Sequence, residues 1–325
     1  MVKWCGPTEK CRAVPLPYRD QVLTGPDGLY NLASMNSTLS LAYHTITWRD
    51  DIAGALEDIA RAGFDAFETF SFPPRPDDTW QGYVERLARA YKERPEHYLE
   101  TASYRTPEEL LVLARKHGLR LVAMYCSGCF IDPALVESEV RAILAAARFA
   151  RAADGEYLVL GGGMNQTGVY AGPDYGRLAA ALHAIGRGCR EMGLTACYHP
   201  HSGTMVENAV QLELFCNETD PDLIGLAPDV AHLARGGADP VETIRRWADR
   251  IVYIHLKDIR DNEFVELGQG DIDWPAVAET LREIGYRGWA VVELDDTSRT
   301  PLESAAISRR YLEELLGAEN ERSST

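Results

Sequence analysis

The chain has 325 residues, of which 46% are hydrophobic and 25% are charged, so it is long enough to bury a sizeable core. Its formal net charge of −16 repels phosphate backbones and disfavours a nucleic-acid partner. The start, "MVKWCGPTEK", lacks the apolar stretch of a signal peptide, and no run approaches the roughly 18 apolar residues of a membrane span. We therefore expect a cytoplasmic, globular protein of enzyme size that needs neither nucleic acid nor membrane.

The first part of the chain carries glycine, proline and polar residues without a clear period. We predict an N-terminal extension over residues 1–34, a candidate for poor order, with Met35 as an alternative start. Residues 35–317 are predicted to form a single catalytic domain, and residues 318–325 a C-terminal tail.

Seven cysteines at irregular spacing are typical of reduced thiols and not of a disulfide framework. Cys126 and Cys129 form a C-x-x-C, a motif found in redox sites and in halves of zinc sites. Because no second C-x-x-C completes a zinc site, we interpret these two cysteines as buried or loop thiols.

Helical and strand patterns alternate along the rest of the chain, and several helices end at a glycine that leads directly into a strand. Apolar residues recur at helical spacing from Ile52 to Ile59, and Gly63 follows. Thr106-Pro107-x-Glu109 is a capping box that predicts the start of another helix. The later helices are predicted to end at Gly118, Gly155, Gly193 and Gly285.

Short apolar runs between these helices predict eight strands. They cover residues 39–44, 64–70, 119–126, 156–162, 194–199, 222–229, 250–258 and 288–295. Nearly continuous apolar strands belong to parallel sheets that are buried on both faces. Eight such units over roughly 280 residues fit a (β/α)8 TIM barrel, an α/β fold of about 250 residues. A doubly wound sheet is the alternative, but no G-x-G-x-x-G follows the first strand, and the "GQG" at 268–270 is too weak to predict a phosphate site.

Active sites of TIM barrels lie at the C-terminal ends of the strands. Five predicted strands end in polar residues: Glu68; His199 and His201; Asp229 and His232; His255, Lys257 and Asp258; and Glu293. Imidazoles and carboxylates gathered around one centre suit Mn²⁺, Co²⁺, Fe²⁺ or Zn²⁺. We therefore predict a metal site made by the four strands that end in His199, Asp229, His255 and Glu293.

Each of these residues also has a purely structural interpretation. His199 alone would be a core histidine bonded to a carbonyl, Asp229 a cap of the following turn, and Glu293 the partner of an arginine. Four consecutive strands that all end in good ligands favour the metal site. His232 is interpreted as a supporting or substrate-contacting residue, and His44, at the end of the first strand, as a lining residue.

The second half of the chain resembles a known family. The motifs are "YHPHSGT" at 198–204, "PDVAHLARGGADP" at 228–240, "RIVYIHLKD" at 250–258, "LGQGDIDWPAV" at 267–277 and "GYRGWAVVELD" at 285–295. They are similar to the xylose-isomerase-like TIM barrels grouped as sugar phosphate isomerases and epimerases, and especially to the inosose dehydratases. The first half matches through Trp48 and through "GFDAFET" around Glu68.

The resemblance implies one divalent metal, Mn²⁺ first, with Co²⁺, Fe²⁺, Zn²⁺ and Mg²⁺ as alternatives. Family members hold it through an acidic residue on strand five, Asp on strand six, His on strand seven and Glu on strand eight. By position the last three fall on Asp229, His255 and Glu293. Where the epimerases have Glu on strand five, this chain has His199, as the inosose dehydratases do, which favours dehydration over simple epimerisation. Glu207 is a weaker alternative as a ligand.

The substrate that the resemblance implies is a polyol with a ketone, either a keto-sugar or a cyclitol. We expect Glu293 to remove the proton next to the ketone, and Lys257 or His201 to protonate the leaving hydroxyl. Glu68 and Trp48 are expected to orient the sugar, although ordinary packing explains Trp48 equally well. The alternatives are cleavage of a glycoside of a 3-keto sugar and a non-catalytic sugar-binding barrel, and a homo-oligomer is open. An apurinic-site endonuclease shares this barrel but is disfavoured by the net charge of −16.

Overall fold

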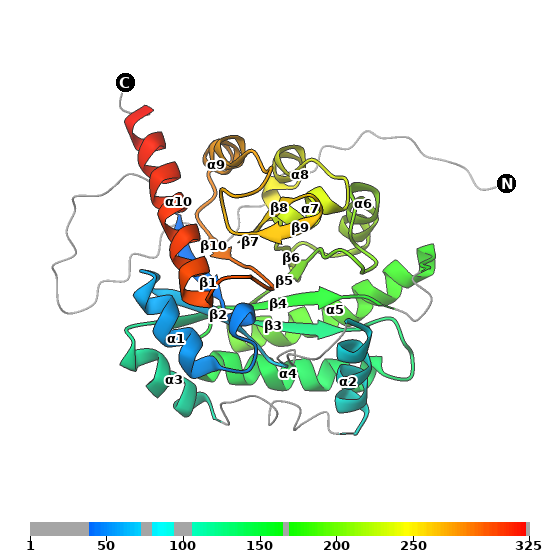
Figure 1. The fold of residues 1–325 in the computed structure, drawn as a ribbon. Coiled ribbons are helices and arrows are strands. Elements are labelled where there is room, and N and C mark those ends of the chain that lie inside the picture. The colour runs from blue at the N-terminus through cyan, green and yellow to red at the C-terminus, as the bar shows by residue number, and fades with distance from the viewer. Residues whose placement is uncertain (1–38, 73–79, 94–105, 165–168, 323–325) are drawn as a thin grey trace. The chain divides into compact units, whose positions relative to one another are not determined.

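The computed structural model describes residues 39–72, 80–93, 106–164 and 169–322 (Figure 1). The predicted N-terminal extension over 1–34 lies outside the described residues. Eight parallel strands form one sheet in the order β6-β5-β4-β3-β2-β1-β10-β7. The strands are β1 (Ser40–His44), β2 (Ala66–Phe70), β3 (Arg120–Gly128), β4 (Tyr157–Gly162), β5 (Thr195–His199), β6 (Gly225–Leu226), β7 (Tyr253–Leu256) and β10 (Trp289–Val292).

The two ends of this sheet meet, and the barrel closes there. Parallel bridges join Leu226 to Ile251 and Asp229 to His255, so β6 lies beside β7. The His255 N–H donates to the carbonyl of Pro228 at 2.9 Å. β6 is much shorter than the run predicted over 222–229. Before it, the N–H groups of Leu223 and Ile224 donate to the Asp220 carbonyl in a turn, and after it Pro228 has no N–H to donate to a ladder. The predicted TIM barrel is confirmed.

Helices follow the strands and lie around the outside of the barrel in Figure 1. They are η1 (Thr45–Trp48), α1 (Ile52–Arg61), α2 (Trp80–Glu93), α3 (Pro107–Lys116), α4 (Val136–Ala152), α5 (Gly172–Met192), α6 (Ala209–Glu218), α7 (Val230–Arg235), α8 (Pro240–Arg246), η3 (Ala248–Arg250), α9 (Trp274–Glu283) and α10 (Pro301–Arg322). The Thr106 side chain caps α3 by accepting the N–H of Glu109 at 3.1 Å, as the capping box predicts. None of the described helices is long and apolar enough to cross a membrane.

Two helix ends differ from the prediction. After α4 the left-handed residue is Asp154, with φ 64°, and not Gly155. Gly155 instead allows the backbone to approach the end of α4 closely, because a Cβ there would lie 2.8 Å from the Ala150 carbonyl oxygen. At the other end of the chain, α10 runs through Gly317 to Arg322, past the predicted boundary at 317, because the residues that follow include good helix formers.

The segment between β7 and α9 contains a hairpin that was not predicted. β8 (Asp258–Arg260) pairs antiparallel with β9 (Glu263–Val265), and the two turn residues, Asp261 and Asn262, have φ of 51° and 66°. Positive φ at both central residues is typical of a type I′ hairpin turn, which Asp and Asn tolerate. The adjacent residues Asp261 and Asn262 are therefore the feature of the sequence that indicates this hairpin turn.

The "GQG" motif wraps around a buried carboxylate. Asp258 accepts the N–H groups of Gly268 at 2.9 Å and Gly270 at 3.0 Å, and the indole N–H of Trp274 at 2.9 Å. A Cβ on Gly270 would lie 2.1 Å from Asp258 Oδ1, so only glycine allows this approach. Asp258 therefore fixes the β7–α9 segment, and the glycines serve this packing.

Apolar side chains fill the barrel and the space between strands and helices as two clusters. The inner cluster includes Val122, Val159 and Val291, and it also contains Phe70 and Tyr125. Those two aromatic rings contact His44, with ring centroids 4.5 Å and 6.1 Å away. The apolar filling of the barrel therefore gives way to polar side chains where the strands end, as expected for this fold.

Candidate metal centre

Four buried side chains converge at the C-terminal end of the barrel. His199 ends β5, Asp229 follows β6 as the N-cap of α7, His255 lies in β7, and Glu293 follows β10. Each contributes one nitrogen or oxygen atom to a group in which all four atoms lie within 4.8 Å of one another. The structure therefore brings the four predicted ligands together, and their binding of a metal stays a prediction.

The converging atoms lack hydrogen bonds. Both ring nitrogens of His199, Asp229 Oδ2, His255 Nδ1 and Glu293 Oε2 are buried without a hydrogen-bond partner among the described residues. His255 Nδ1 lies 2.6 Å from Glu293 Oε2, yet the geometry is not that of a hydrogen bond. Buried polar atoms are normally satisfied, so such a cluster needs an explanation. A divalent cation explains it, because two imidazoles and two carboxylates are donors that Zn²⁺, Mn²⁺ or Fe²⁺ accept.

Glu68 lies behind the cluster and orients one proposed ligand. Its Oε2 accepts the N–H of His255 Nε2 at 2.8 Å and the hydroxyl of Tyr253 at 2.9 Å. A proton on Nε2 leaves the lone pair of His255 on Nδ1, the atom that faces the cluster. A carboxylate behind a ligating histidine is a common supporting contact in metal sites. The contacts of Glu68 are therefore those of a support for His255, where the sequence predicted a residue that orients the sugar.

The charges in the cluster shift the pKa values in opposite directions. Burial lowers the pKa of His199 well below its usual value. Burial would lower the pKa of His255 too, but Glu68 and Glu293 raise it to about 10. Burial raises the pKa of Asp229 to about 6, although Lys257 opposes this. For Glu293, Lys257 and His255 outweigh burial and hold the pKa well below its usual range. A bound cation would replace the proton on His255.

Lys257 is completely buried beside the cluster. Its ammonium donates to Glu293 Oε1 at 2.9 Å and to Asp295 Oδ2 at 3.1 Å, and His232 Nε2 lies 3.3 Å away. Burial alone would lower its pKa, but the carboxylates of Asp295 and Glu293 raise the pKa above the usual value. Lys257 is thus held as a cation. Asp295 was not predicted as a site residue, although it lies two residues after Glu293.

His201 and His232 lie against each other next to His199. Their ring centroids are 3.8 Å apart, and the rings are tilted by only 35°. His199, His201 and His232 also come within 4.8 Å of one another. Nearly stacked rings do not direct their lone pairs at one ion, and the Lys257 ammonium at 3.3 Å from His232 Nε2 opposes a second cation. These three histidines are therefore a poor second metal site.

The family of the chain follows from its sequence. The family model of the xylose isomerase-like TIM barrel matches residues 56–315, which is most of the chain. The chain belongs to this family. The resemblance read from the sequence motifs is thereby confirmed, and the barrel is that of a xylose isomerase-like protein.

Among curated proteins, this xylose isomerase-like chain is similar to inosose dehydratases. It is 29% identical to the one from Geobacillus kaustophilus over 245 residues, which is 65% of this chain and 79% of that protein. It is 33% identical to the one from Lacticaseibacillus casei over 161 residues, 43% of this chain and about half (54%) of that protein. These similarities support the prediction that the chain is an enzyme.

Among solved structures, the chain is similar to the IolI protein with a bound zinc atom. The TM-score is 0.65 at 16% identity, with 86% of this chain and 99% of that chain covered. At this identity the likeness shows the shared barrel alone.

His44 and Trp48, which were predicted to line the site of this xylose isomerase-like chain, lie in different surroundings. His44 Nδ1 accepts the N–H of Ile46 at 3.0 Å, and its Nε2 lies 3.7 Å from Glu68 Oε1, so His44 lies beside Glu68, and its role as a lining residue stays a prediction. Trp48 instead belongs to the hydrophobic core, and its indole N–H donates to Asp58 Oδ2 at 3.0 Å. Packing therefore explains Trp48, and we no longer assign it to the sugar.

The remaining candidates serve the framework. Glu207 Oε2 accepts the N–H of Gly203 at 2.8 Å, a contact that fixes the loop after β5 and not a place in the cluster. Burial raises the pKa of the Cys129 thiol to about 12, which does not suit redox chemistry at the C-x-x-C. Cys129 is therefore interpreted as a buried thiol, as predicted from the sequence.

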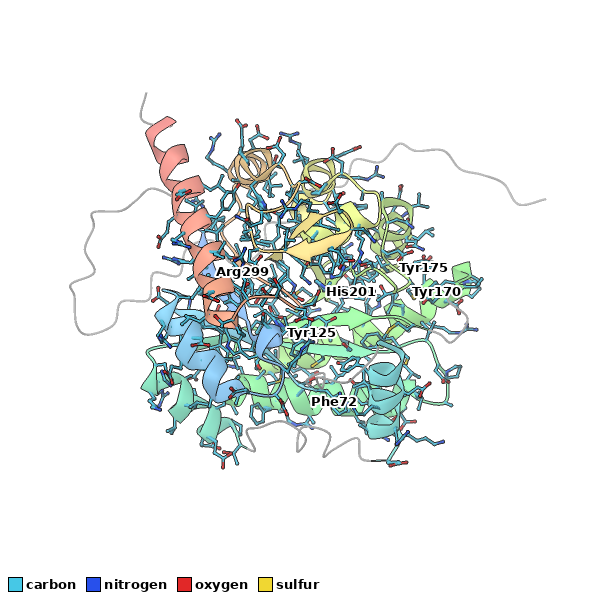
Figure 2. All side chains as sticks on the ribbon, in the orientation of Figure 1. Phe72, Tyr125, Tyr170, Tyr175, His201 and Arg299 are labelled. Atoms are coloured by element: carbon cyan, nitrogen blue, oxygen red, sulfur yellow. The ribbon has the colours of Figure 1, made fainter. Side chains whose placement is uncertain are left out.

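An aromatic wall next to the cluster was missed by the sequence analysis. The ring centroid of Tyr125, on β3, lies 5.7 Å from that of His199 and 5.5 Å from that of Phe70. Figure 2 labels Tyr125 and His201, and the ring centroid of His201 lies 5.6 Å from that of His199. A Cβ on Gly161 would lie 1.9 Å from the Tyr125 hydroxyl, so the neighbouring strand leaves space for this ring. Side chains alternate between the two faces of a strand, and this alternation along β3 is the feature of the sequence that could have placed Tyr125 inside the barrel.

Proposed function

We propose that the chain is a divalent-metal-dependent dehydratase or isomerase of a keto-sugar or cyclitol, with dehydration as the first choice. The observation that carries the proposal is the convergence of His199, Asp229, His255 and Glu293, whose converging atoms are buried without hydrogen bonds. The similarity to inosose dehydratases supports a ketone-bearing cyclitol as the substrate class. Mn²⁺ is the first ion to test, because carboxylate ligands suit it and imidazoles are compatible.

The four ligands would hold the cation, and Glu68 would keep the His255 ring in place. When bound, a divalent cation supplies positive charge that stabilises the negative charge developing on a substrate carbonyl oxygen. This stabilisation makes the hydrogen on the neighbouring carbon acidic enough for a side chain to remove it. The chemistry thus needs a base and, for dehydration, an acid for the leaving hydroxyl.

We assign the base to His201 in preference to Glu293. Glu293 Oε1 accepts from Lys257, and its Oε2 belongs to the proposed ligand set, so neither oxygen is well placed to take up a proton. His201 Nδ1 lies 2.6 Å from the Ser202 carbonyl oxygen, which can only accept. The proton of His201 is therefore on Nδ1, and its lone pair is on Nε2, as a base requires.

We assign the acid to Lys257. Its ammonium is kept protonated by two carboxylates and lies beside the proposed ligand Glu293. From there it would donate to a hydroxyl that leaves the carbon next to the one that lost its proton. Loss of the hydroxyl gives dehydration, whereas return of a proton to the other face of that carbon, or to the former carbonyl carbon, gives isomerisation.

The experiment compares keto-substrates with and without metal. Purified protein loaded with Mn²⁺, Co²⁺ or Zn²⁺ is given inosose, a 3-keto-glucoside or a free ketose, and the enone is followed by its ultraviolet absorbance. We expect turnover of inosose that chelator abolishes and metal restores. Full turnover in the chelated protein would contradict metal dependence, and release of an aglycone from the 3-keto-glucoside alone would favour glycoside cleavage.

Three variants separate the roles of the residues. Glu293→Gln should lose both metal and turnover, whereas His201→Asn should keep the metal and lose turnover. Glu156→Gln is the matched control, since this carboxylate precedes β4 and bonds to Arg120 at 2.8 Å, at the opposite end of the barrel. Wild-type turnover by His201→Asn would overturn the assignment of the base.

A further inference from the structure

The Lys257 ammonium is held by acceptors from two parts of the chain. Glu293 and Asp295, after β10, are carboxylates, and His232, on α7, is an imidazole. An ammonium has three N–H donors, and in the protein without substrate these three acceptors lie within hydrogen-bond distance of it. His232 is the one neutral acceptor of the three, so its orientation helps to decide where the ammonium points.

Three groups contact the ring nitrogens of His232: the Lys257 ammonium at Nε2, and the hydroxyl and the more distant backbone N–H of Ser202 at Nδ1. The ammonium only donates, so it favours a lone pair on the nitrogen that faces it, Nε2. The proton is then on Nδ1, which lies 2.6 Å from the hydroxyl oxygen of Ser202. The hydroxyl accepts this proton in a short hydrogen bond. Ser202 thus stabilises the tautomer that Lys257 needs.

Without that hydroxyl, the balance of the two tautomers changes. The remaining neighbour of Nδ1 is the backbone N–H of Ser202 at 3.3 Å, which is a donor. A donor at Nδ1 favours a lone pair there and a proton on Nε2, and the Nε2–H would then point at the ammonium. Repulsion between the two donors would displace Lys257 from its contacts.

Both partners of this hydrogen bond are fixed by the surrounding backbone. The N–H of His232 donates to Asp229 Oδ1 at 2.8 Å, so α7 and a proposed ligand are joined. The loop that carries Ser202 is closed by a bond from the Thr204 hydroxyl to the His201 carbonyl at 2.8 Å. The hydroxyl of Ser202 therefore has a defined position relative to the imidazole.

We infer that Ser202 is a positioning residue that acts through the His232 imidazole to aim the Lys257 ammonium. The inference rests on the proposed function for the role of Lys257, and its structural part is independent of any substrate. Ser202 would thereby support the protonation of the leaving hydroxyl by Lys257.

The test uses the zinc-loaded full chain with ¹⁵N-labelled histidine, and a His232→Asn variant assigns the signals of His232. We expect Nδ1 of His232 to be protonated in the wild type and in Ser202→Thr, which keeps the hydroxyl. In Ser202→Ala and in Ser202→Val, the isostere of threonine without a hydroxyl, the proton should move to Nε2. Ser138→Ala is the matched control, because it removes a hydroxyl that donates to Leu135 at 2.7 Å on α4.

Kinetics give the second measurement. Ser202→Ala and Ser202→Val should lower kcat by about 10-fold or more, with KM and bound zinc unchanged, as typical for loss of a supporting contact, and Ser202→Thr should restore kcat. A wild-type tautomer in both hydroxyl-free variants would overturn the inference. If no variant, wild type included, acts on inosose, the proposed function fails, and the tautomer measurement still decides the role of Ser202.

Discussion

Replacing Glu68 with glutamine tests whether a carboxylate behind the cluster strengthens metal binding. The amide oxygen of the variant can still accept from His255 Nε2 and from the Tyr253 hydroxyl, which lie 2.8 Å and 2.9 Å from Glu68 Oε2. Shape and hydrogen bonds are thus kept, and only the negative charge is lost. Glu68→Gln therefore isolates the electrostatic part of the contact.

The expected loss is set by two opposing effects. A charged acceptor makes a hydrogen bond about 1 to 1.5 kcal/mol stronger than a neutral one, and supporting contacts of this kind change metal affinity by about 10- to 100-fold. The same carboxylate also stabilises the competing proton, since Glu68 and Glu293 raise the pKa of His255 to about 10 although burial opposes them. A divalent ion carries twice the charge of that proton, so the net loss should be about 10-fold at neutral pH.

The assay is competition for Zn²⁺ against a chromophoric chelator, with the metal content checked by elemental analysis. Glu156→Gln is the control for loss of a carboxylate elsewhere in the barrel, and its affinity should match the wild type. If Glu68→Gln binds zinc as tightly as the wild type while Glu293→Gln binds weakly, the electrostatic argument for Glu68 is wrong.

Three further predictions concern the metal, the framework and the aromatic wall. Zinc at about 100 times its Kd should stabilise the folded protein by about 2.7 kcal/mol in thermal unfolding, and His199→Ala should lose most of this gain; equal stability with and without zinc would contradict the site. Glu139→Gln should lower the free energy of unfolding in urea by about 1 to 3 kcal/mol. The buried Glu139 carboxylate accepts two backbone N–H groups of the β3–α4 segment, at 2.9 Å and 2.8 Å, and an amide oxygen can replace only one of its two oxygens. An unchanged unfolding midpoint would refute this role. Gly161→Ala should displace the Tyr125 ring and alter KM more than metal affinity, and a KM like that of the wild type would exclude Tyr125 from substrate binding.

The pH dependence offers a check on Glu139 that needs no metal. Burial raises its pKa above the ordinary 4.5, although the backbone N–H groups oppose the shift. A carboxyl with a raised folded pKa adds stability below the unfolded value and loses it as the pH rises through the folded value. In thermal melts, Glu139→Gln should therefore show a smaller decline in stability than the wild type as the pH rises above 4.5.

Most of the fold was predictable because buried parallel strands leave a clear signal in the sequence. Seven of the predicted strands lie where the apolar runs are, and the eighth, β6, is short because a turn closed on the Asp220 carbonyl precedes it and Pro228 follows it. The end of α4 was predicted less well, since Asp154 and not Gly155 takes the left-handed conformation. Local pattern thus identifies elements, whereas single-residue geometry depends on tertiary neighbours.

The candidate site was predictable only in part. Polar residues at strand ends indicated His199, Asp229, His255 and Glu293, because the fold brings strand ends together. The supporting roles depend on contacts across distant strands, such as the bond from His255 to Glu68, which are 187 residues apart. No sequence period encodes such a contact, so Glu68 was assigned to the substrate, and Asp295 and Tyr125 were missed.

Among the described residues, the barrel closes at the seam between β6 and β7, where two isolated bridges join the strands. Asp229 and His255, which form one of these bridges, also belong to the proposed ligand set. An ion bound there would link β6 to β7, and so stabilise the closed barrel, in addition to its proposed role in the reaction. Amide hydrogen exchange at Val252 and His255, which donate across the seam, should then slow when the ion is bound, while amides of the long β3–β4 ladder barely change.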